Sequence, residues 1–430
     1  MKRLFLSVIA LIAIAGCSQN SIILPPPVLD NPPSHAHDWG NPVDYELSGD
    51  TLYAIYQCEC GEVKKEIISS SSNTIVATGI DAEEALAKVT RGSTIIVDNT
   101  SAQKALDLAM DGCTIYFSAD TYTGGETDGF LFVRPGKNNV NRIVNHSKPD
   151  ENVEVGSALD TGAIYYYYSE LNGVKLIADD DAVFDCALWL TAGHIHTEGS
   201  YDVVRGQKVE AGVAGSYFAH MAIDNLEISN FHFSGEGNNI YFQYALHSDV
   251  SYLDGLRILG CEFNGTGSTN TDMAIRLLTD IGIENGYVWQ NISIEDCVMN
   301  GCYQGLYVQN AHNISVTGCD ISNTTHNGIA IQNGGDASSS TDTDVFSGDI
   351  EIKGNTITNT GDRAIRFGDG QDAVIEISEN IFISPAYDAA RELLKSGTLQ
   401  DCSYTFTGNA LDDVSISNVS GSESSWIVSV

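Results

Sequence analysis

Residues 313–323, NISVTGCDISN, nearly repeat residues 291–301, NISIEDCVMNG, at a spacing of 22 residues. In both segments apolar and polar residues alternate and the run ends in Asn or Gly, a pattern typical of a short β-strand followed by a turn. Four further segments have the same pattern: NLEISNFHFSG (225–235), GLRILGCEFNG (255–265), DIEIKGNTITN (349–359) and VIEISENIFIS (374–384). A repeat near 22 residues that holds several strands and no helix predicts a solenoid of strands.

These repeats resemble the right-handed parallel β-helix, or pectate-lyase-like, superfamily over roughly residues 90–430. The resemblance implies an all-β fold in which each coil stacks the same position about 4.8 Å above the last. The superfamily hosts lyases, hydrolases, phage tailspikes and adhesins, so the fold by itself predicts no reaction. We expect the cysteines of the seventh position to fill the core rather than to bind metal. This column holds Phe231, Cys261, Cys297, Cys319, Asn355 and Asn380.

The start of the chain is typical of an exported lipoprotein. Residues 1–16 combine two cations with a short apolar run, as in a signal peptide, and the ending IAGC resembles a bacterial lipobox with Cys17 as the lipidated residue. Residues 17–34 are Pro-rich and predict an extended tether. We therefore expect an exported protein, anchored at the bacterial membrane or cell surface through Cys17. A plain secretory peptide is the alternative.

The overall composition bears on partners. The formal net charge is −36, from 57 acidic and 21 basic side chains. A field of this sign argues against nucleic acid as a partner, and it repels acidic polysaccharides unless a cation or a local basic patch intervenes. The oligomeric state is not predicted by these features.

Residues 35–70 predict a small β module beside the tether. His35, His37, Cys58 and Cys60 form a set that a structural zinc would suit, although Cys-x-Cys is tighter than the usual spacing in zinc sites. A local disulfide and a plain β-ribbon are the alternatives, and the ribbon is favoured.

Two similar segments, 81–97 and 101–117, predict the N-terminal cap and first coil within residues 71–125. Each reads as an amphipathic helix, a Gly turn and a strand, and such helices would cover the open end of the solenoid core. Residues 126–430 then form the β-helix, with a short helix at 386–397 before the last strands.

A second strand follows each repeated segment, and its outward positions would line one face. Aligned by their inward residues, these strands carry cations, tyrosines and amides, which can bind sugar rings, hydroxyls and carboxylates. The predicted substrate-binding residues are Tyr241, Arg276, Gln304, Tyr307, Gln309, Asn327 and Gln332. The corner before these strands would hold Asp272, Tyr303, His326 and Asp362. We therefore predict a polysaccharide as partner, although outward β positions favour Tyr, Arg and Gln in any case.

The reaction is predicted only as a class. Asp272 and Asp362 lie three coils apart in this alignment, roughly 14 Å at about 4.8 Å per coil, whereas a glycosidase pair needs about 5 to 9.5 Å. A lyase instead needs a base and a cation that neutralises a uronate carboxylate. The superfamily uses Lys or Arg as base, often with calcium. The resemblance thus implies Arg363 and Arg366, within GDRAIRFGDG, as catalytic candidates.

His326 is the third catalytic candidate, and Asp362 with Asp369 would hold calcium, the one cofactor predicted. The leading hypothesis is a lyase that acts on a uronate-containing polysaccharide. A non-catalytic glycan-binding or adhesive surface protein is the alternative, because the same face of tyrosines and amides suffices for binding. A purely structural spacer is the third possibility.

Overall fold

The computed structural model describes residues 39–40, 42–49, 51–58, 60–69, 73–125, 129–133, 139–145, 147–154, 165–191, 194–195, 201–202, 217–234, 239–243, 251–267, 272–277, 289–332, 345–383, 394–395, 397, 399–412 and 427–429. The predicted signal peptide, Cys17, the tether, His35 and His37 lie outside these residues. Within the described part, no helix is long and apolar enough to cross a membrane.

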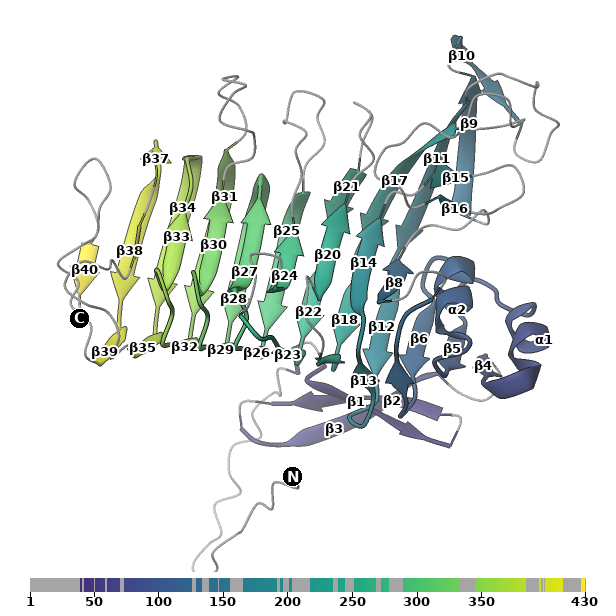
Figure 1. Ribbon diagram of the computed structural model, residues 1–430, viewed down its shortest axis with the longest axis horizontal. Helices are drawn as coiled ribbons and strands as arrows, with labels where there is room; N and C mark the ends of the chain where they lie inside the picture. Colours follow the sequence, from purple (N-terminus) through teal and green to yellow (C-terminus); the bar gives the residue numbers. More distant parts are fainter. Residues whose placement is uncertain are drawn as a thin grey trace, which may run out of the picture.

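Three parallel sheets wind around one axis and form an elongated solenoid, with the strands of successive coils side by side (Figure 1). The first sheet contains β4 (Thr74–Ala77), β5 (Thr94–Val97), β6 (Thr114–Phe117), β12 (Lys175–Ala178), β18 (Glu227–Ser229), β22 (Arg257–Leu259), β25 (Trp289–Glu295), β28 (Ala311–Thr317), β31 (Phe346–Lys353), β34 (Gly370–Ser378), β38 (Ser403–Thr407) and β40 (Ile427–Ser429). Four further strands extend this sheet: β11 (Tyr165–Asn172), β17 (Tyr217–Asp224), β21 (Ser251–Asp254) and β37 (Leu399–Gln400). β9 (Val140–Asn145) pairs antiparallel with β11 and with β10 (Lys148–Val153).

The second and third sheets complete each coil. The second sheet contains β7 (Thr121–Tyr122), β13 (Val183–Phe184), β19 (His232–Phe233), β23 (Glu262–Asn264), β26 (Val298–Asn300), β29 (Asp320–Ser322), β32 (Thr356–Thr358), β35 (Ile381–Ile383) and β39 (Ala410–Asp412). The third sheet contains β8 (Phe130–Val133), β14 (Ala187–Thr191), β20 (Ile240–Gln243), β24 (Met273–Leu277), β27 (Gln304–Gln309), β30 (Ile329–Gln332), β33 (Ile365–Phe367) and β36 (Leu394–Lys395). A separate antiparallel pair joins β15 (His194–Ile195) and β16 (Tyr201–Asp202). The all-β parallel solenoid is therefore confirmed.

Left-handed backbone at the corners explains why Asn and Gly recur in the repeats. In the coil quoted first, Asn313, Gly318 and Asn323 have φ angles of 53°, 66° and 55°. In the coil before it, Asn291 and Gly301 have φ angles of 58° and 72°. Gly adopts this conformation without strain and Asn more readily than most residues, so the sequence fixes where each coil bends.

The predicted inner column lies in the core. Cys261, Cys297 and Cys319 are buried and carry free thiols. Each thiol lies near a carbonyl oxygen of the preceding coil; the Cys319 Sγ, for example, is 3.7 Å from the oxygen of Ile294. The cysteines thus fill the core, as expected from the sequence.

An asparagine ladder continues this column. We use that name for Asn355, Asn380 and Asn409, which are all buried. The Asn355 Nδ2 donates to the oxygen of Val316 at 2.8 Å, and its Oδ1 accepts from the backbone N–H of Cys319 at 2.9 Å. The other two members repeat this pattern one coil further on. The sequence alignment stopped at Asn380 and missed Asn409.

Helices cover one end of the core. A 3₁₀ turn, η1 (Gly79–Asp81), leads into α1 (Ala82–Leu86), and α2 (Ala102–Leu108) follows β5. Ala102, Ala105 and Leu106 of α2 are buried against the solenoid. Both helices stand at the end away from the C-terminus (Figure 1). The expected helix–turn–strand pairs are present, with shorter helices than the sequence suggested.

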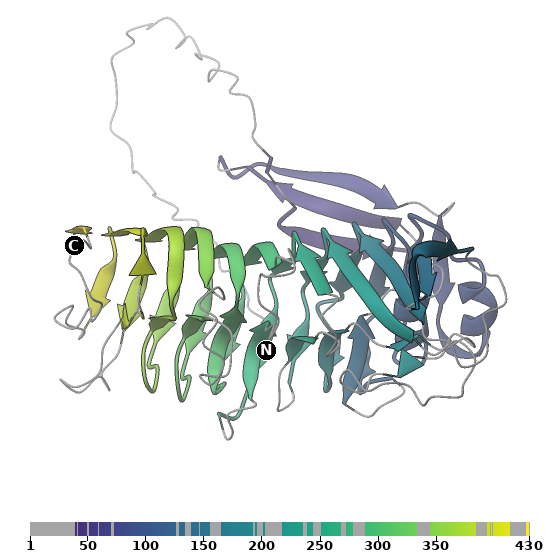
Figure 2. The ribbon, with the colours of Figure 1, turned by 90° about the horizontal axis from the view of Figure 1, so that it is seen from above.

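The N-terminal module is a three-stranded antiparallel sheet of β1 (Asp44–Ser48), β2 (Thr51–Gln57) and β3 (Val63–Ser69). Its inner face buries Tyr45, Leu52 and Ala54 against Ile96 and Ile177 on the outer face of the first sheet. Figure 2 shows this sheet along one long side of the solenoid. The module therefore shares a small apolar core with the solenoid.

Charged groups fasten this module to the solenoid. The Tyr45 hydroxyl donates to the Glu227 carboxylate, which also lies 3.4 Å from the Lys175 Nζ and 3.3 Å from the Arg257 Nη1. The Arg257 Nη2 also donates to the oxygen of Pro42 at 3.4 Å. We call these five residues the N-terminal junction.

The helix expected at 386–397 lies mostly outside the described residues. Its described part is not helical, because Leu394–Lys395 form β36. Leu394 pairs there with Ile365 and so continues the third sheet by one more coil.

Candidate functional site

The third sheet carries the outward column that the sequence alignment predicted. Tyr241 pairs with Arg276, Arg276 with Tyr307, Tyr307 with Ala330 and Ala330 with Arg366 in successive parallel strands. The inward neighbours are buried, as the alternation requires. We call this set the outward column. The structure describes the backbone of Tyr241 but not its side chain.

The corner before these strands also stacks as predicted. The backbone N–H of Tyr303 donates to the oxygen of Asp272 at 2.6 Å, that of His326 to Tyr303 at 2.8 Å and that of Asp362 to His326 at 2.9 Å. We call these four residues the corner column. Asp272 and Asp362 are thus three coils apart, which makes roughly 14 Å and excludes them as a glycosidase carboxylate pair.

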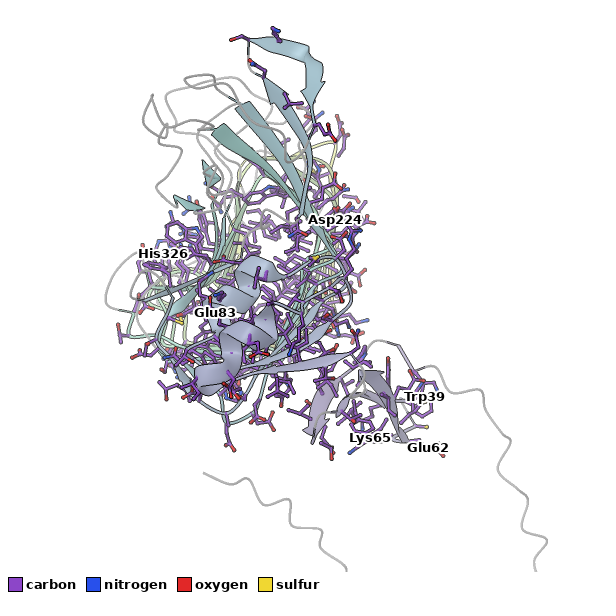
Figure 3. All side chains as sticks on the ribbon, turned by 90° about the vertical axis from the view of Figure 1, so that its right-hand side faces the viewer. Trp39, Glu62, Lys65, Glu83, Asp224 and His326 are labelled. Carbon is purple, nitrogen blue, oxygen red and sulfur yellow. The ribbon has the colours of Figure 1, made fainter. Side chains whose placement is uncertain are left out.

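His326 is the centre of the corner column. Its ring stacks on Tyr303, with the centroids 5.0 Å apart and the planes 11° from parallel. Its Nδ1 is 2.6 Å from the amide nitrogen of Asn327, and its Nε2 is 3.5 Å from a carboxylate oxygen of Asp362. Because an amide nitrogen only donates, Nδ1 is the acceptor and Nε2 carries the proton. His326 lies on the side of the solenoid opposite to Trp39 in the N-terminal module (Figure 3).

The surroundings of His326 favour the neutral ring. Burial lowers its pKa from the ordinary value, and the positive charges of Arg366 and Arg363 lower it further, while Asp362 acts in the opposite direction. A neutral imidazole at neutral pH is the form that can accept a proton.

The two candidate arginines differ in their partners. Arg363 forms an ion pair with Asp362. Arg366 is partly exposed on the outward column. Among the described residues, no hydrogen bond or ion pair engages its guanidinium, and only its backbone oxygen accepts, from Gln332. Arg366 thus offers a partly exposed guanidinium to an anionic ligand.

The remaining predicted binding residues divide by burial. Arg276, Tyr307 and Gln309 are partly exposed, and the Gln309 amide donates to the Tyr307 hydroxyl at 2.9 Å. Gln304 and Asn327 are only 4% and 1% exposed and are bonded to each other at 3.0 Å. Each of these two directly follows a residue of the corner column, at the point where the chain turns into the third sheet. They support His326 rather than face a ligand.

Gln332 and Asp272 are also buried. The Asp272 carboxylate accepts from the backbone N–H groups of Thr266 and Gly267, at 2.7 and 2.5 Å. Asp272 therefore holds the loop before β24 in place. The corner residues that remain candidates for contact with a ligand are Tyr303, His326 and Asp362, in the three later coils.

A comparison with known families gives the hand of the coil. The sequence model of the family described as "Right handed beta helix region" matches residues 211–411. This match gives residues 211–411 as a right-handed coil, within the parallel β-solenoid described above. No curated protein matches it.

Solved structures with a similar β-helix share little sequence with this one. A polygalacturonase from Erwinia carotovora subsp. carotovora is 9% identical, with 81% of this chain and 96% of that chain covered and a TM-score of 0.28. A periplasmic alginate epimerase is 9% identical, with 81% and 84% covered and a TM-score of 0.22. A mutant of that epimerase is 8% identical, with the same coverage and a TM-score of 0.21. Similarity this low says nothing of substrate or reaction.

The predicted metal sites stay predictions. In the part of the β-helix that the structure describes, no group of three or more His, Cys, Asp and Glu side chains is placed to hold a metal. Asp362 is engaged by Arg363 and His326. Cys58 is buried and Cys60 exposed in the turn between β2 and β3, and the two histidines of the proposed zinc set lie outside the described residues.

Sequence reasoning missed two aromatic residues at the start of the third sheet. Phe130 and Trp189 are partly exposed, and their ring centroids are 5.1 Å apart. The signal was present in the runs FLFV (130–133) and ALWLT (187–191), which precede the recognisable repeats and so were not aligned with them.

Proposed function

We propose that this β-helix binds an acidic polysaccharide along the outer face of its third sheet and cleaves uronate linkages there by elimination. The observation that carries the proposal is the guanidinium of Arg366, which no hydrogen bond or ion pair engages among the described residues and which is in register with Tyr307, two strands away on the outward column. A cation beside a flat ring can hold a sugar carboxylate while the ring contacts the apolar face of the sugar.

The charge distribution supports an anionic ligand on this face. The whole chain carries a formal charge of −36, which repels a polyanion. Arg276 and Arg366 nevertheless both lie on the outward column within four successive coils of the third sheet, and Arg363, which is paired with Asp362, lies at the corner beside Arg366. On the second sheet, the strands of the same coils carry residues such as Asp320 and Thr356, neither of which is a cation. A local basic patch on an acidic protein directs a polyanion to one surface.

Elimination assigns a role to each group of the site. Arg366 binds and neutralises the uronate carboxylate, which acidifies the proton on the adjacent carbon. The amide of Asn327 first gives up its hydrogen bond to His326 Nδ1 and keeps the one to Gln304. The Nδ1 atom of His326 then accepts the proton from the sugar. A carbon–carbon double bond forms as the glycosidic C–O bond breaks, and the leaving oxygen takes a proton from water. Asp362 holds the imidazole in position.

Binding without cleavage is the second candidate, and one observation favours it. In the present geometry Asn327 donates to His326 Nδ1, and the Nε2 proton faces Asp362, so neither ring nitrogen offers a lone pair to a ligand. A site that only holds a glycan needs no such lone pair. The tyrosines and arginines of the outward column suffice for it.

The deciding experiment uses the chain that begins after Cys17. It is incubated with polygalacturonate, alginate, hyaluronate and a neutral glucan, with calcium or with chelator, while unsaturated-uronate absorbance, new reducing ends and binding are followed. We expect the unsaturated-uronate absorbance and the number of reducing ends to rise with one acidic polymer, and both to be at least tenfold lower in Arg366→Ala. The matched control is Lys353→Ala, which removes a cation from the first sheet.

The other outcomes are equally informative. Binding that Arg366→Ala weakens, without product, assigns the chain to the second candidate. Reducing ends without unsaturated product would mean hydrolysis and contradict elimination. Binding to none of the polymers, or binding that Lys353→Ala weakens as much as Arg366→Ala, contradicts the proposed face.

We also propose that the protein is exported and held at a bacterial membrane by lipid on Cys17. The support is the N-terminal sequence alone. Metabolic labelling with a fatty acid should mark the full-length protein, and Cys17→Ala should abolish the label and release the protein from the membrane fraction.

A further inference from the structure

The outward column continues past Tyr241 into an aromatic cluster. Tyr241 pairs with Trp189, and Trp189 pairs with Phe132 in the first strand of the third sheet. The Trp189 centroid lies 5.6 Å from that of Phe132 and 5.1 Å from that of Phe130. Rings thus occupy the coils that precede the first arginine.

This cluster lies outside the main core. Phe130 and Trp189 stay partly exposed, whereas Phe132 beneath them is 1% exposed. The second sheet presents Thr121 and Val183 at the outward positions of its first two strands. The concentration of rings is therefore particular to the third sheet and is not a general feature of these coils.

We propose that Phe130 and Trp189 form a second subsite, which stacks on the apolar face of a pyranose ring of the same polysaccharide that Arg366 holds. This inference rests on the proposed function. Trp189 and Arg366 are five register steps apart, or roughly 24 Å at about 4.8 Å per step. The ligand is consequently a long acidic polymer bound along its length, and not a short oligosaccharide bound at its end.

The sugar polymer is the occupant that the surface favours. The aromatic cluster is continuous in register with the basic patch, so one extended chain can contact both. A second copy of this protein is disfavoured because each copy carries a formal charge of −36. Partly exposed Trp and Phe rings suit the flat C–H face of a sugar.

The test compares ligand lengths. Binding of the best acidic polymer and of its purified trimer is measured for the wild type, Trp189→Ala, Trp189→Phe and Arg366→Ala. We expect Trp189→Ala to weaken polymer binding about tenfold, the effect of losing one good aromatic contact, and to leave trimer binding unchanged. Arg366→Ala should weaken both. Trp189→Phe should retain most polymer affinity, which guards against loss through misfolding.

Fluorescence gives an independent reading. Polymer binding should quench the emission of the wild type but not that of Trp189→Phe, whereas Trp289→Phe, a change in the buried core, should leave the quenching intact. Equal effects of Trp189→Ala on polymer and trimer, or no effect on either, overturn this inference and leave the proposed function standing. Dimerisation that Trp189→Ala abolishes would assign the cluster to a second copy and overturn it as well. Failure of the wild type to bind any polymer overturns both proposals.

Discussion

The asparagine ladder and the corner column meet in the coil of Asn355 and Asp362 but follow opposite rules. Inside the core, one residue recurs because each coil leaves the same backbone N–H and C=O to be satisfied, and the asparagine amide satisfies both. At the corner, the residue changes with every coil, from Tyr303 to His326 to Asp362. Repetition along a column of this β-helix therefore indicates a structural requirement. A departure from repetition on the outer face indicates where to look for function.

The largest expected effect is on the ladder. Asn355→Ala should lower the free energy of unfolding by about 3 kcal/mol, because a buried backbone N–H and a buried carbonyl each lose a partner. Thr356→Ala, on the surface of the same coil, should change it by less than about 0.5 kcal/mol. Urea unfolding measures both. Equal effects at the two positions would remove the distinction between ladder and surface.

Asp272 belongs to the corner column by position but has a structural role, because its carboxylate binds two backbone N–H groups. Its replacement should therefore affect stability, as in the ladder, and not glycan binding. Asp272→Ala leaves the N–H groups of Thr266 and Gly267 without their carboxylate, and we expect a loss of about 2 kcal/mol. Glycan binding per folded molecule should change little. A stable variant that has lost binding would instead place Asp272 in the site.

Replacement of Asp362 should have the opposite result, a small loss of stability and a large loss of activity. Asp362→Asn removes a partly exposed ion pair with Arg363, so the free energy of unfolding should fall by less than about 1 kcal/mol. Product formation should fall at least tenfold, because His326 loses the group that fixes its orientation. The measurement pairs thermal melting with the uronate assay. A large loss of stability with unchanged turnover per folded molecule would mean that Asp362 has a structural role and no role in the reaction.

The smallest expected effect is a pH dependence. The pKa of His326 is lowered in the folded protein by burial and by Arg366 and Arg363. As the pH falls below about 6.5, the unfolded chain takes up the proton first, so stability is lost toward acid and is fully present above that pH. His326→Gln should flatten the dependence between pH 7 and pH 5. An unchanged slope would mean that the ring is freely solvated.

The sequence predicted the solenoid and the outward column because both follow from alternation and from Gly and Asn at left-handed corners. It could not predict the burial of Gln304 and Asn327, since that depends on how tightly the corner turns. Nor could it predict that Asp362 pairs with Arg363 rather than with Arg366, because three charged side chains within five residues allow several pairings. The sequence also could not predict where the N-terminal module packs on the solenoid. The contact that places it joins Tyr45 and Glu227, which are 182 residues apart in the chain, and no local pattern indicates such a pairing.

The N-terminal junction has a mechanical consequence. Tension applied through the residues before Pro42 enters the molecule at Arg257 and Glu227, on the first sheet. We expect the side-chain bonds of the junction to break before any coil unwinds, because the strands of the β-helix run crosswise to its axis and share the load (Figure 1). His326 lies on the side of the solenoid opposite to Trp39, so a load taken up by this module does not act directly on the face that carries His326 (Figure 3).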